Sequence, residues 1–278
     1  MNRDMSKRKL TFIVAVNSRD VLQNNLLASP CFRKPHGHQI IIQEGFNSAA
    51  KAYNDAIDRA QNELMVFVHQ DIILPEQWLN QVENALQHLE EQDPSWGVLG
   101  CYGKTQTNGG RGWVYQSGPG MIGAPFENPV PVQTLDEIVL ILRRSSQLRF
   151  DEGLPHFHLY GTDICLRAKQ SGRTSYAIPA FCIHNSSQGF VLPKEFYECY
   201  WHVRRAWSSQ LPIQASCIRI TRLNLAMYKR RLSEIYFRYR RPHAIKGRRV
   251  QDIRQLVKEA DITIEQKVED EATSHCTV

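Results

Sequence analysis

The stretch Glu63-Leu-Met-Val-Phe-Val-His-Gln-Asp-Ile-Ile-Leu-Pro75 decides which fold the sequence predicts. Its five apolar residues, Leu64 to Val68, follow one another without a polar break, which is typical of a strand buried on both faces of a parallel sheet. The run ends in His69-Gln70-Asp71, and open α/β sheets bind ligands at the carboxyl ends of their strands. Asp71 is therefore the first candidate for a metal or phosphate site, although an aspartate here also suits a turn cap.

Strands and helices alternate on either side of this stretch. Apolar runs before and after it predict further strands, and amphipathic segments that open at Ser48 and Pro75 predict helices between them. The predicted strands are Leu10–Val16, Gln39–Gln43 and Trp96–Cys101. Alternation of this kind predicts an α/β fold with a mostly parallel sheet and crossover helices. No G-x-G-x-x-G follows the first strand and no P-loop motif is present, which disfavours a classical NAD fold and a P-loop NTPase.

Length and composition describe a globular protein with a sizeable core. The chain has 278 residues, enough for one large domain or for one domain with an appendage. Its apolar runs are too short to cross a bilayer, and the apolar segment after the basic N-terminal residues is too short for a secretory signal. The seven cysteines form no C-x-x-C pair. We therefore expect a cytoplasmic protein.

The second half of the chain is expected to continue the sheet and then change to helices. Residues 103–129, with Trp113 and Tyr115, predict either a long functional loop or an irregular hairpin. Later segments predict short strands and a helix that opens at Asp163. These strands are Val130–Val132, Glu137–Arg143, Ser175–Ile178 and Phe181–Ile183. Helices are predicted from Pro193, over Ala215–Arg238 and over Val250–Ala260, so we expect a catalytic domain at 1–190 and a helical extension at 191–278.

Four motifs in this order resemble the family 2 glycosyltransferases, which are GT-A enzymes that use nucleotide-diphosphate sugars. The motifs are a strand that ends at Asn17, Ser48-Ala-Ala-Lys-Ala-Tyr-Asn54, Val66-Phe-Val-His-Gln-Asp71, and Phe150-Asp-Glu followed by Tyr160-Gly-Thr-Asp163-Ile-Cys-Leu-Arg and His184. The resemblance covers roughly residues 10–208 and implies a GT-A, Rossmann-like sheet flanked by helices. In that family the third motif is D-x-D, which binds a divalent cation and through it the donor diphosphate.

One departure from the family pattern concerns the metal. His69 stands where the first Asp of D-x-D is expected, so Asp71 is the only carboxylate of the triplet. One carboxylate with phosphates and water can still hold Mg²⁺ or Mn²⁺, and Mn²⁺ tolerates an imidazole better. His184 is a second candidate metal ligand, with a histidine satisfied at a strand end as the alternative.

The resemblance also implies roles for other residues. Asp163 falls where the family places the general base of a single displacement, which inverts the anomeric centre; a plain helix N-cap is the alternative. Asn17, Glu44 and Asn54 fall where the family holds the nucleotide. On the acceptor side lie Asp136 and Trp113, although Trp113 and Tyr115 are equally suited to packing the loop onto the sheet.

The net charge of +6 is concentrated in the C-terminal part of the chain. Between Lys194 and Arg249 there are fourteen Lys or Arg and three Glu. A basic helical surface suits anionic lipid at the inner face of a membrane, at about 1 kcal/mol per basic residue, or a face that mediates self-association. Nucleic acid is not expected, because no binding motif accompanies the charge. The basic residues are Arg222, Lys229, Arg230, Arg231, Arg238, Arg240, Arg241, Arg248 and Arg249.

The sequence therefore predicts an inverting, metal-assisted transferase that takes a nucleotide-diphosphate sugar and a saccharide, glycolipid or protein acceptor. Two alternatives from other classes stay open at this point. The first is a sugar-nucleotide-binding protein without catalysis, which the histidine at position 69 keeps open. The second is a metal-dependent hydrolase or nucleotidyltransferase that uses the same His and Asp residues.

Overall fold

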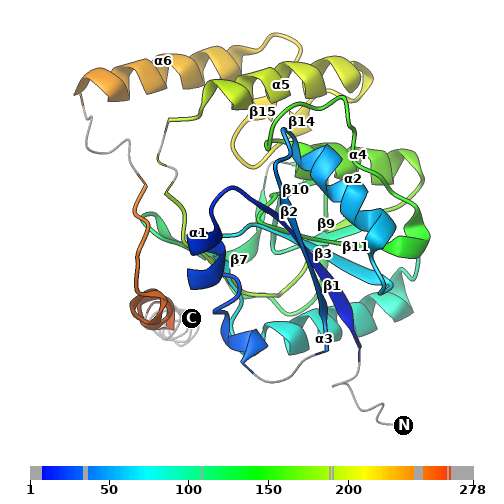
Figure 1. Cartoon of the computed structure of the whole chain (residues 1–278). Helices are drawn as coiled ribbons and strands as arrows, with labels where there is room; N and C mark the ends of the chain where they lie inside the picture. The colour runs from blue at the N-terminus through cyan, green and yellow to red at the C-terminus, as the bar shows by residue number, and fades with distance from the viewer. Residues whose placement is uncertain are drawn as a thin grey trace, which may run out of the picture.

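Strand β3 (Leu64–Val68) lies in the middle of a mixed sheet (Figure 1). The computed structural model describes residues 8–33, 37–107, 109–187, 189, 191–240, 247–261 and 263. Within these residues the order of the seven strands in the sheet is β2 (Gln39–Glu44), β1 (Leu10–Val16), β3, β11 (Val139–Arg143), β5 (Val98–Gly100), β12 (Ser175–Ala177) and β9 (Val130–Val132). Strands β2, β1 and β3 are parallel, as predicted, whereas β11 runs antiparallel to both β3 and β5.

Both faces of this sheet are covered, which explains the unbroken apolar runs of its central strands. On β1, Ile13 packs with α2 and α4, whereas Phe12 and Val14 pack with α1 and α3. Figure 1 shows α2 and α4 on one side of the sheet and α3 on the other. The helices are α1 (Arg19–Asn24), α2 (Ala49–Arg59), α3 (Trp78–Gln92), α4 (Tyr160–Gln170), α5 (Lys194–Ala206) and α6 (Leu225–Arg240), with short 3-10 turns at Pro30–Phe32, Arg144–Ser146 and Ser208–Gln210.

A second sheet lies beside the carboxyl end of β3. The described residues of the stretch 103–129 form hairpin pairs of this sheet, which settles the open choice between a loop and a hairpin. Strand β13 pairs with both β7 and β4, so the end of β13 lies directly beside the turn that follows β3. Its strands are β10 (Thr134–Leu135), β6 (Tyr102–Lys104), β7 (Gly110–Gln116), β13 (Cys182–His184) and β4 (Ile72–Ile73), with β8 (Gly120–Gly123) on β7.

The C-terminal part differs from the prediction at its second helix. A helix was predicted from Ala215, but strands β14 (Ile213–Gln214) and β15 (Arg219–Ile220) precede α6, which begins only at Leu225. This segment forms strands and not a helix because its isoleucines pack in the same core as α5. Its alternation of buried and exposed residues also suits a strand. The acidic tail after Asp261 and Arg241 lie outside the described residues, apart from residue 263.

The third predicted C-terminal helix is present over residues 253–261. It begins three residues later than predicted, because the Asp252 side chain accepts a hydrogen bond from the N–H of Arg254 (2.9 Å) at its start. Leu256 and Ala260 pack against the second sheet, in a small core that includes Ile183. The C-terminal segment therefore lies on the sheet that carries the end of β13. No helix in the described part of the chain is both long and apolar enough to cross a membrane.

Candidate active site

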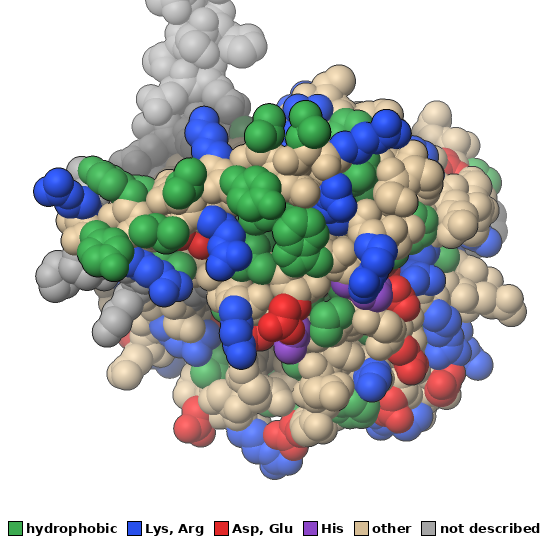
Figure 2. Space-filling view, turned by 90° about the horizontal axis from the view of Figure 1, so that it is seen from above, with side chains coloured by type: hydrophobic (Ala, Val, Ile, Leu, Met, Phe, Trp, Pro, Cys, Tyr) green, Lys and Arg blue, Asp and Glu red, His purple; other side chains and the backbone are tan. Residues whose placement is uncertain are grey.

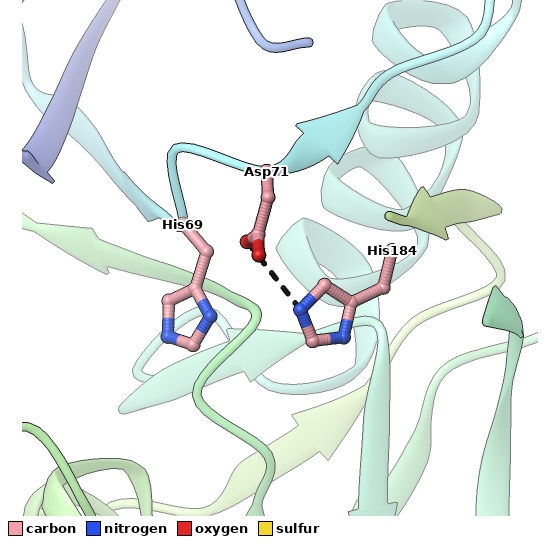
Figure 3. Close-up of side chains that lie close together, drawn as sticks. All are labelled: His69, Asp71 and His184. Atoms are coloured by element: carbon pink, nitrogen blue, oxygen red, sulfur yellow. Dashed lines mark ion pairs between the residues drawn. The ribbon is translucent and has the colours of Figure 1, made fainter. Parts of the chain in front are cut away.

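Three side chains come together where β3 and β13 end (Figure 3). His69 and Asp71 lie on the turn between β3 and β4, and His184 is the last residue of β13. The pairing of His184 with Ile72 brings the histidine next to this turn. One ligand atom from each of the three residues lies within 4.8 Å of the others. The structure thus brings together the two predicted metal ligands, Asp71 and His184, and adds His69 to them.

Asp71 is the most strongly held carboxylate of the site. Its Oδ1 lies 3.4 Å from Nε2 of His184, and Arg249 donates a hydrogen bond from Nη2 to Oδ2 (2.8 Å). Burial raises the pKa of Asp71, but the hydrogen bond from His184 and the nearby positive charge, that of Arg249 included, hold the pKa well below its ordinary value. Asp71 is therefore ionised at neutral pH. In the sequence, Arg249 is only one of several basic residues of the C-terminal part.

Tyr160 orients the His69 ring. The tyrosine hydroxyl donates its proton to the backbone oxygen of Glu137 (3.2 Å) and lies 2.8 Å from Nε2 of His69. Because this proton is committed to Glu137, Nε2 of His69 acts as the donor to the tyrosine oxygen. The lone pair of His69 is then on Nδ1, the ring nitrogen that faces Asp71 in Figure 3. Burial lowers the pKa of His69, which favours this neutral form.

The chemistry of this donor set fits a divalent cation. It offers one carboxylate and two imidazoles whose candidate ligand atoms lie within 4.8 Å of one another. Mg²⁺ prefers a shell of oxygen ligands, whereas Mn²⁺ accepts oxygen and imidazole nitrogen together. The set therefore suits Mn²⁺ better than Mg²⁺.

A cavity of about 310 Å³ opens beside the three side chains, a volume in the range of small-molecule sites. Its wall carries His69 and His184 together with two acids, Asp136 and Glu137. Strand β11 brings the acids there, because β11 is antiparallel to β3 and its first residues lie at the carboxyl end of β3. The N–H of His69 donates to the oxygen of Ile138 (3.1 Å), which joins the two segments directly. Other lining residues are Tyr102, Val114, Gln116, Ile122, Phe157, His158, Ser186, Leu192, Phe196, Cys217 and Arg230.

Glu137 is a residue of this wall that the sequence analysis did not select. Burial and the charge of Asp136 raise the pKa of Glu137 to about 8, although hydrogen bonds from the backbone N–H groups of Glu137, Gly161 and Leu159 lower it. Its carboxylate therefore lies at the N-terminus of α4. Position 161 admits only glycine here, because a Cβ would lie 2.7 Å from the oxygen of Leu135 and 3.2 Å from Cγ of Glu137.

The structure does not place Asp163 in the cavity wall. Its side chain is 1% exposed and is held at both oxygens: Arg167 donates from Nε to Oδ2 and Trp207 from Nε1 to Oδ1, each at 2.7 Å. Burial raises the pKa of Asp163, and these two partners lower it. Asp163 lies in the first turn of α4 and is not its N-cap, which is Leu159. The contacts fit a residue that joins α4 to the end of α5.

Two of the three predicted nucleotide contacts lie at the same edge of the sheet as Asp71. Asn17 follows β1, and its side chain accepts a hydrogen bond from Nε2 of Gln70 (2.5 Å). Glu44 ends β2 and pairs with Arg19 (2.6 Å). The third predicted residue, Asn54, lies elsewhere.

The side chain of Asn54 is committed to the backbone of a neighbouring segment. It donates to the oxygen of Phe150 and accepts from the N–H of Phe150, each at 3.0 Å. At 8% exposure it is buried, so it anchors α2 to the segment that follows β11. Its predicted contact with a nucleotide has no support in this geometry.

The two predicted acceptor-side residues have different positions. Asp136 lines the cavity, and its Oδ1 accepts from the N–H of Ile138 (3.3 Å). Trp113 is not part of the wall and packs on Phe181, with ring centroids 4.7 Å apart. Side chains alternate between the faces of β7, and it is Val114 that faces the cavity. This contact fits the alternative in which Trp113 packs the hairpin onto the sheet, and its acceptor-side role stays a prediction.

Comparisons with known proteins identify the family and the fold. A model described as "Glycosyltransferase like family" matches residues 11–198. A curated relative, "ATP synthase subunits region ORF 6" of Fuscovulum blasticum, is 29% identical over 140 residues, which are 48% of this chain and 55% of the relative. This chain thus spans about half the length of that relative.

Solved structures of glycosyltransferases are similar in fold. The crystal structure of GalNAc-T7 with UDP, GalNAc and Mn²⁺ has a TM-score of 0.50 at 8% identity. The matched region covers 72% of this chain and 48% of the GalNAc-T7 chain. A second structure is the mannosyltransferase PcManGT from Pyrobaculum calidifontis in complex with GDP-Man and Mn²⁺. It has a TM-score of 0.44 at 14% identity, and the matched region covers 74% of this chain and 63% of the PcManGT chain. The predicted GT-A fold is confirmed. Since the family match covers more than half of its residues, the chain belongs to the glycosyltransferase-like family.

Proposed function

We propose that this protein is an inverting glycosyltransferase, which moves a sugar from a nucleotide-diphosphate sugar to an acceptor hydroxyl. The observation that carries the proposal is the cavity in which His69 and His184, next to Asp71, lie in one wall with Asp136 and Glu137. Transfer needs positive charge at the leaving diphosphate and a base at the acceptor hydroxyl. Asp71 with the two histidines suits the first need, and the neighbouring acids Asp136 and Glu137 suit the second.

For the donor, we assign Asp71, His184 and His69 as ligands of a divalent cation, Mn²⁺ or Mg²⁺. When bound, such a cation neutralises the negative charge that develops on the leaving diphosphate. Arg249 already lies at Asp71 and adds a positive charge at the same place. Asn17 and Glu44 lie at the carboxyl ends of the neighbouring strands and are assigned to the nucleotide.

For the acceptor, we assign the general base to Glu137 in place of Asp163. Glu137 lines the cavity, whereas both oxygens of Asp163 are occupied by Arg167 and Trp207. The acceptor oxygen forms a bond to C1 of the sugar as the bond from C1 to the diphosphate breaks, and the acceptor proton passes to the Glu137 carboxylate. One displacement without a protein nucleophile inverts the anomeric centre. Asp136 is assigned to orient the acceptor, which is a saccharide, glycolipid or protein hydroxyl.

Turnover separates this function from the two alternatives. UDP- and GDP-sugars would first be screened by thermal shift with Mn²⁺, because a ligand of the folded state raises the melting temperature. Nucleoside diphosphate release from the sugar that binds is then measured with and without oligosaccharide or glycolipid acceptors. A transferase releases nucleotide much faster with acceptor. Equal release without acceptor would indicate a hydrolase, and binding without any release would indicate a binding protein; either result would contradict the proposal.

A further inference from the structure

The solvent-facing side of α6 is apolar along its whole length. Leu225 and Leu232 are each 67% exposed, and Tyr239 is 85% exposed. Leu225, Leu232 and Tyr239 are seven residues apart, and further exposed apolar residues lie three or four positions from them. All of these residues share one face of the helix about 100° wide. Figure 2 views the molecule from this side and shows hydrophobic and basic side chains intermixed, with few acidic ones. The members of this apolar stripe are Leu225, Tyr228, Leu232, Ile235, Tyr236 and Tyr239.

The stripe does not face the protein core, because the opposite side of α6 already does so. Met227 is buried in the core that α5 shares. Glu234 is also buried, where it accepts hydrogen bonds from the hydroxyl of Tyr197 (2.8 Å) and from Nε of Arg230 (3.0 Å). The helix therefore has one buried side, which faces α5, and an apolar side in solvent.

Basic residues border the stripe on both sides. At 100° per residue, Lys229 and Arg240 lie along one edge, and Arg231 and Arg238 lie along the other. All four are exposed, and the only acid of the helix is the buried Glu234. The face is thus an apolar strip between two positive borders.

This charge pattern decides between two occupants of the face. Spacing of three and four also suits packing against a second copy of the helix, as in a coiled coil. In such a pair, however, the flanking positions of both copies would place Lys and Arg near one another, without an acid to offset them. An anionic lipid surface complements the borders with headgroups and the strip with acyl chains.

We propose that this face of α6 binds the surface of an anionic lipid bilayer, with the helix parallel to the membrane plane. Leucine and isoleucine would enter the acyl boundary, and the tyrosines would lie at headgroup level, where an apolar ring with a polar tip is favoured. This inference stands on the surface of α6 and is independent of the reaction proposed for the cavity.

The same helix relates the bilayer to the cavity. Arg230 of α6 lines the cavity, as do Leu192 and Phe196 from the α5 side of the helix pair. Arg230 lies on the opposite side of α6 from the stripe, so a bound bilayer would be separated from the cavity by the width of this helix. If the proposed transfer reaction holds, a lipid-linked acceptor is the substrate class that suits this arrangement.

Vesicle sedimentation of the full chain tests the proposal. The protein is mixed with vesicles of phosphatidylcholine alone, or with 30% phosphatidylglycerol added (about one lipid in three). We expect binding to the anionic vesicles that falls steeply as salt is raised, and little binding to phosphatidylcholine alone. The double variant Leu225→Asp/Leu232→Asp is expected to lose at least about tenfold in partition, and Lys229→Glu/Arg238→Glu a similar amount.

The control is Ile42→Asp, which makes one such apolar-to-Asp change at an exposed residue of β2 (42% exposed) and is compared with the single variant Leu232→Asp as well as with the double variant. It is expected to bind as the wild type does. Circular dichroism melting of every variant verifies that α6 still folds. Wild-type protein that does not bind anionic vesicles, or an α6 variant that binds them fully, would overturn the proposal. A wild-type dimer in size-exclusion chromatography with light scattering that Leu225→Asp/Leu232→Asp converts to monomer would also overturn it, in favour of self-association.

Discussion

The hydroxyl of Tyr160, the first residue of α4, lies 2.8 Å from Nε2 of His69, the first residue after β3. This contact joins two segments that are 91 residues apart in the chain. It makes the start of α4 a support for the proposed cation site, since the partner of a ligating histidine sets both the tautomer and the orientation of its ring.

Removal of this hydroxyl should weaken the cation site. Tyr160→Phe leaves Nε2 of His69 without its partner, so the ring loses its fixed orientation and Mn²⁺ affinity should fall by about tenfold to a hundredfold. Electron paramagnetic resonance of free Mn²⁺ measures this affinity. Tyr53→Phe is the control, because Tyr53 reaches the Tyr160 hydroxyl at 3.4 Å but does not touch His69. Equal loss in both variants would refute the orienting role of Tyr160.

Substitution of Asp71 should abolish the dependence of nucleotide binding on metal. In Asp71→Asn the ionised carboxylate is lost, and the two imidazoles that remain bind a divalent cation weakly. Addition of Mn²⁺ should then no longer raise the melting temperature in the presence of the nucleotide that stabilises the wild type. Asp58→Asn, which alters an exposed ion pair with Arg149, is the control. An unchanged Mn²⁺ effect in Asp71→Asn would mean that the cation lies elsewhere.

Asp163 should matter for stability more than for chemistry. Asp163→Asn weakens the buried contacts with Arg167 and Trp207, and we expect the free energy of unfolding to fall by about 2 kcal/mol, since Arg167 is partly solvated. Chemical denaturation measures this loss. Turnover below the melting transition should remain within a few fold of the wild type. A folded variant without turnover would restore Asp163 as the candidate base.

The pH dependence of turnover should report the Glu137 carboxyl. Burial and Asp136 raise its pKa to about 8, so the base form is populated only as pH rises toward that value. We expect kcat/KM to rise tenfold per pH unit below about 8 and to level off above it. His69, His158 and His184 share the cavity, so the profile of Glu137→Gln is needed: the rise assigned to Glu137 should disappear there.

The same shift has a consequence for stability, with its sign given by linkage. The pKa of Glu137 is higher in the folded protein than its ordinary value of 4.5, so the folded state binds this proton more tightly. Its contribution to the free energy of unfolding is thus fully present below pH 4.5 and is lost as pH rises through about 8. In Glu137→Gln this component should be absent, which urea denaturation at several pH values can measure.

Sequence patterns predicted the strands and helices whose formation depends on residues close together in the chain. The apolar run of β3 and the polar triplet after it placed Asp71 at the edge of the sheet, and the alternation of elements predicted the parallel strands before it. In contrast, the position of β11 between β3 and β5 depends on long-range pairing, which no local pattern encodes. Glu137 could have been selected only if the end of β11 had been placed beside His69.

Two further residues show the same limit. Asp163 lies in a helix opening that resembles a catalytic motif, but its partner Trp207 is 44 residues further along the chain. Trp113 is of a residue type that often stacks on sugars. Which face of β7 it occupies depends on the register of the strand, and a shift by one residue would move the side chain to the opposite face. In both cases the residue type indicated a possible role, but the sequence could not show where the side chain points.

The most direct test of the central claim compares Glu137→Gln with Asp163→Asn in acceptor-dependent release of nucleoside diphosphate. The donor is the nucleotide sugar that stabilises the wild type with Mn²⁺, and its affinity is measured in parallel. We predict that Glu137→Gln binds the donor as the wild type does and loses between about a hundredfold and ten-thousandfold in kcat, while Asp163→Asn retains turnover. A Glu137→Gln enzyme with wild-type kcat would contradict the account.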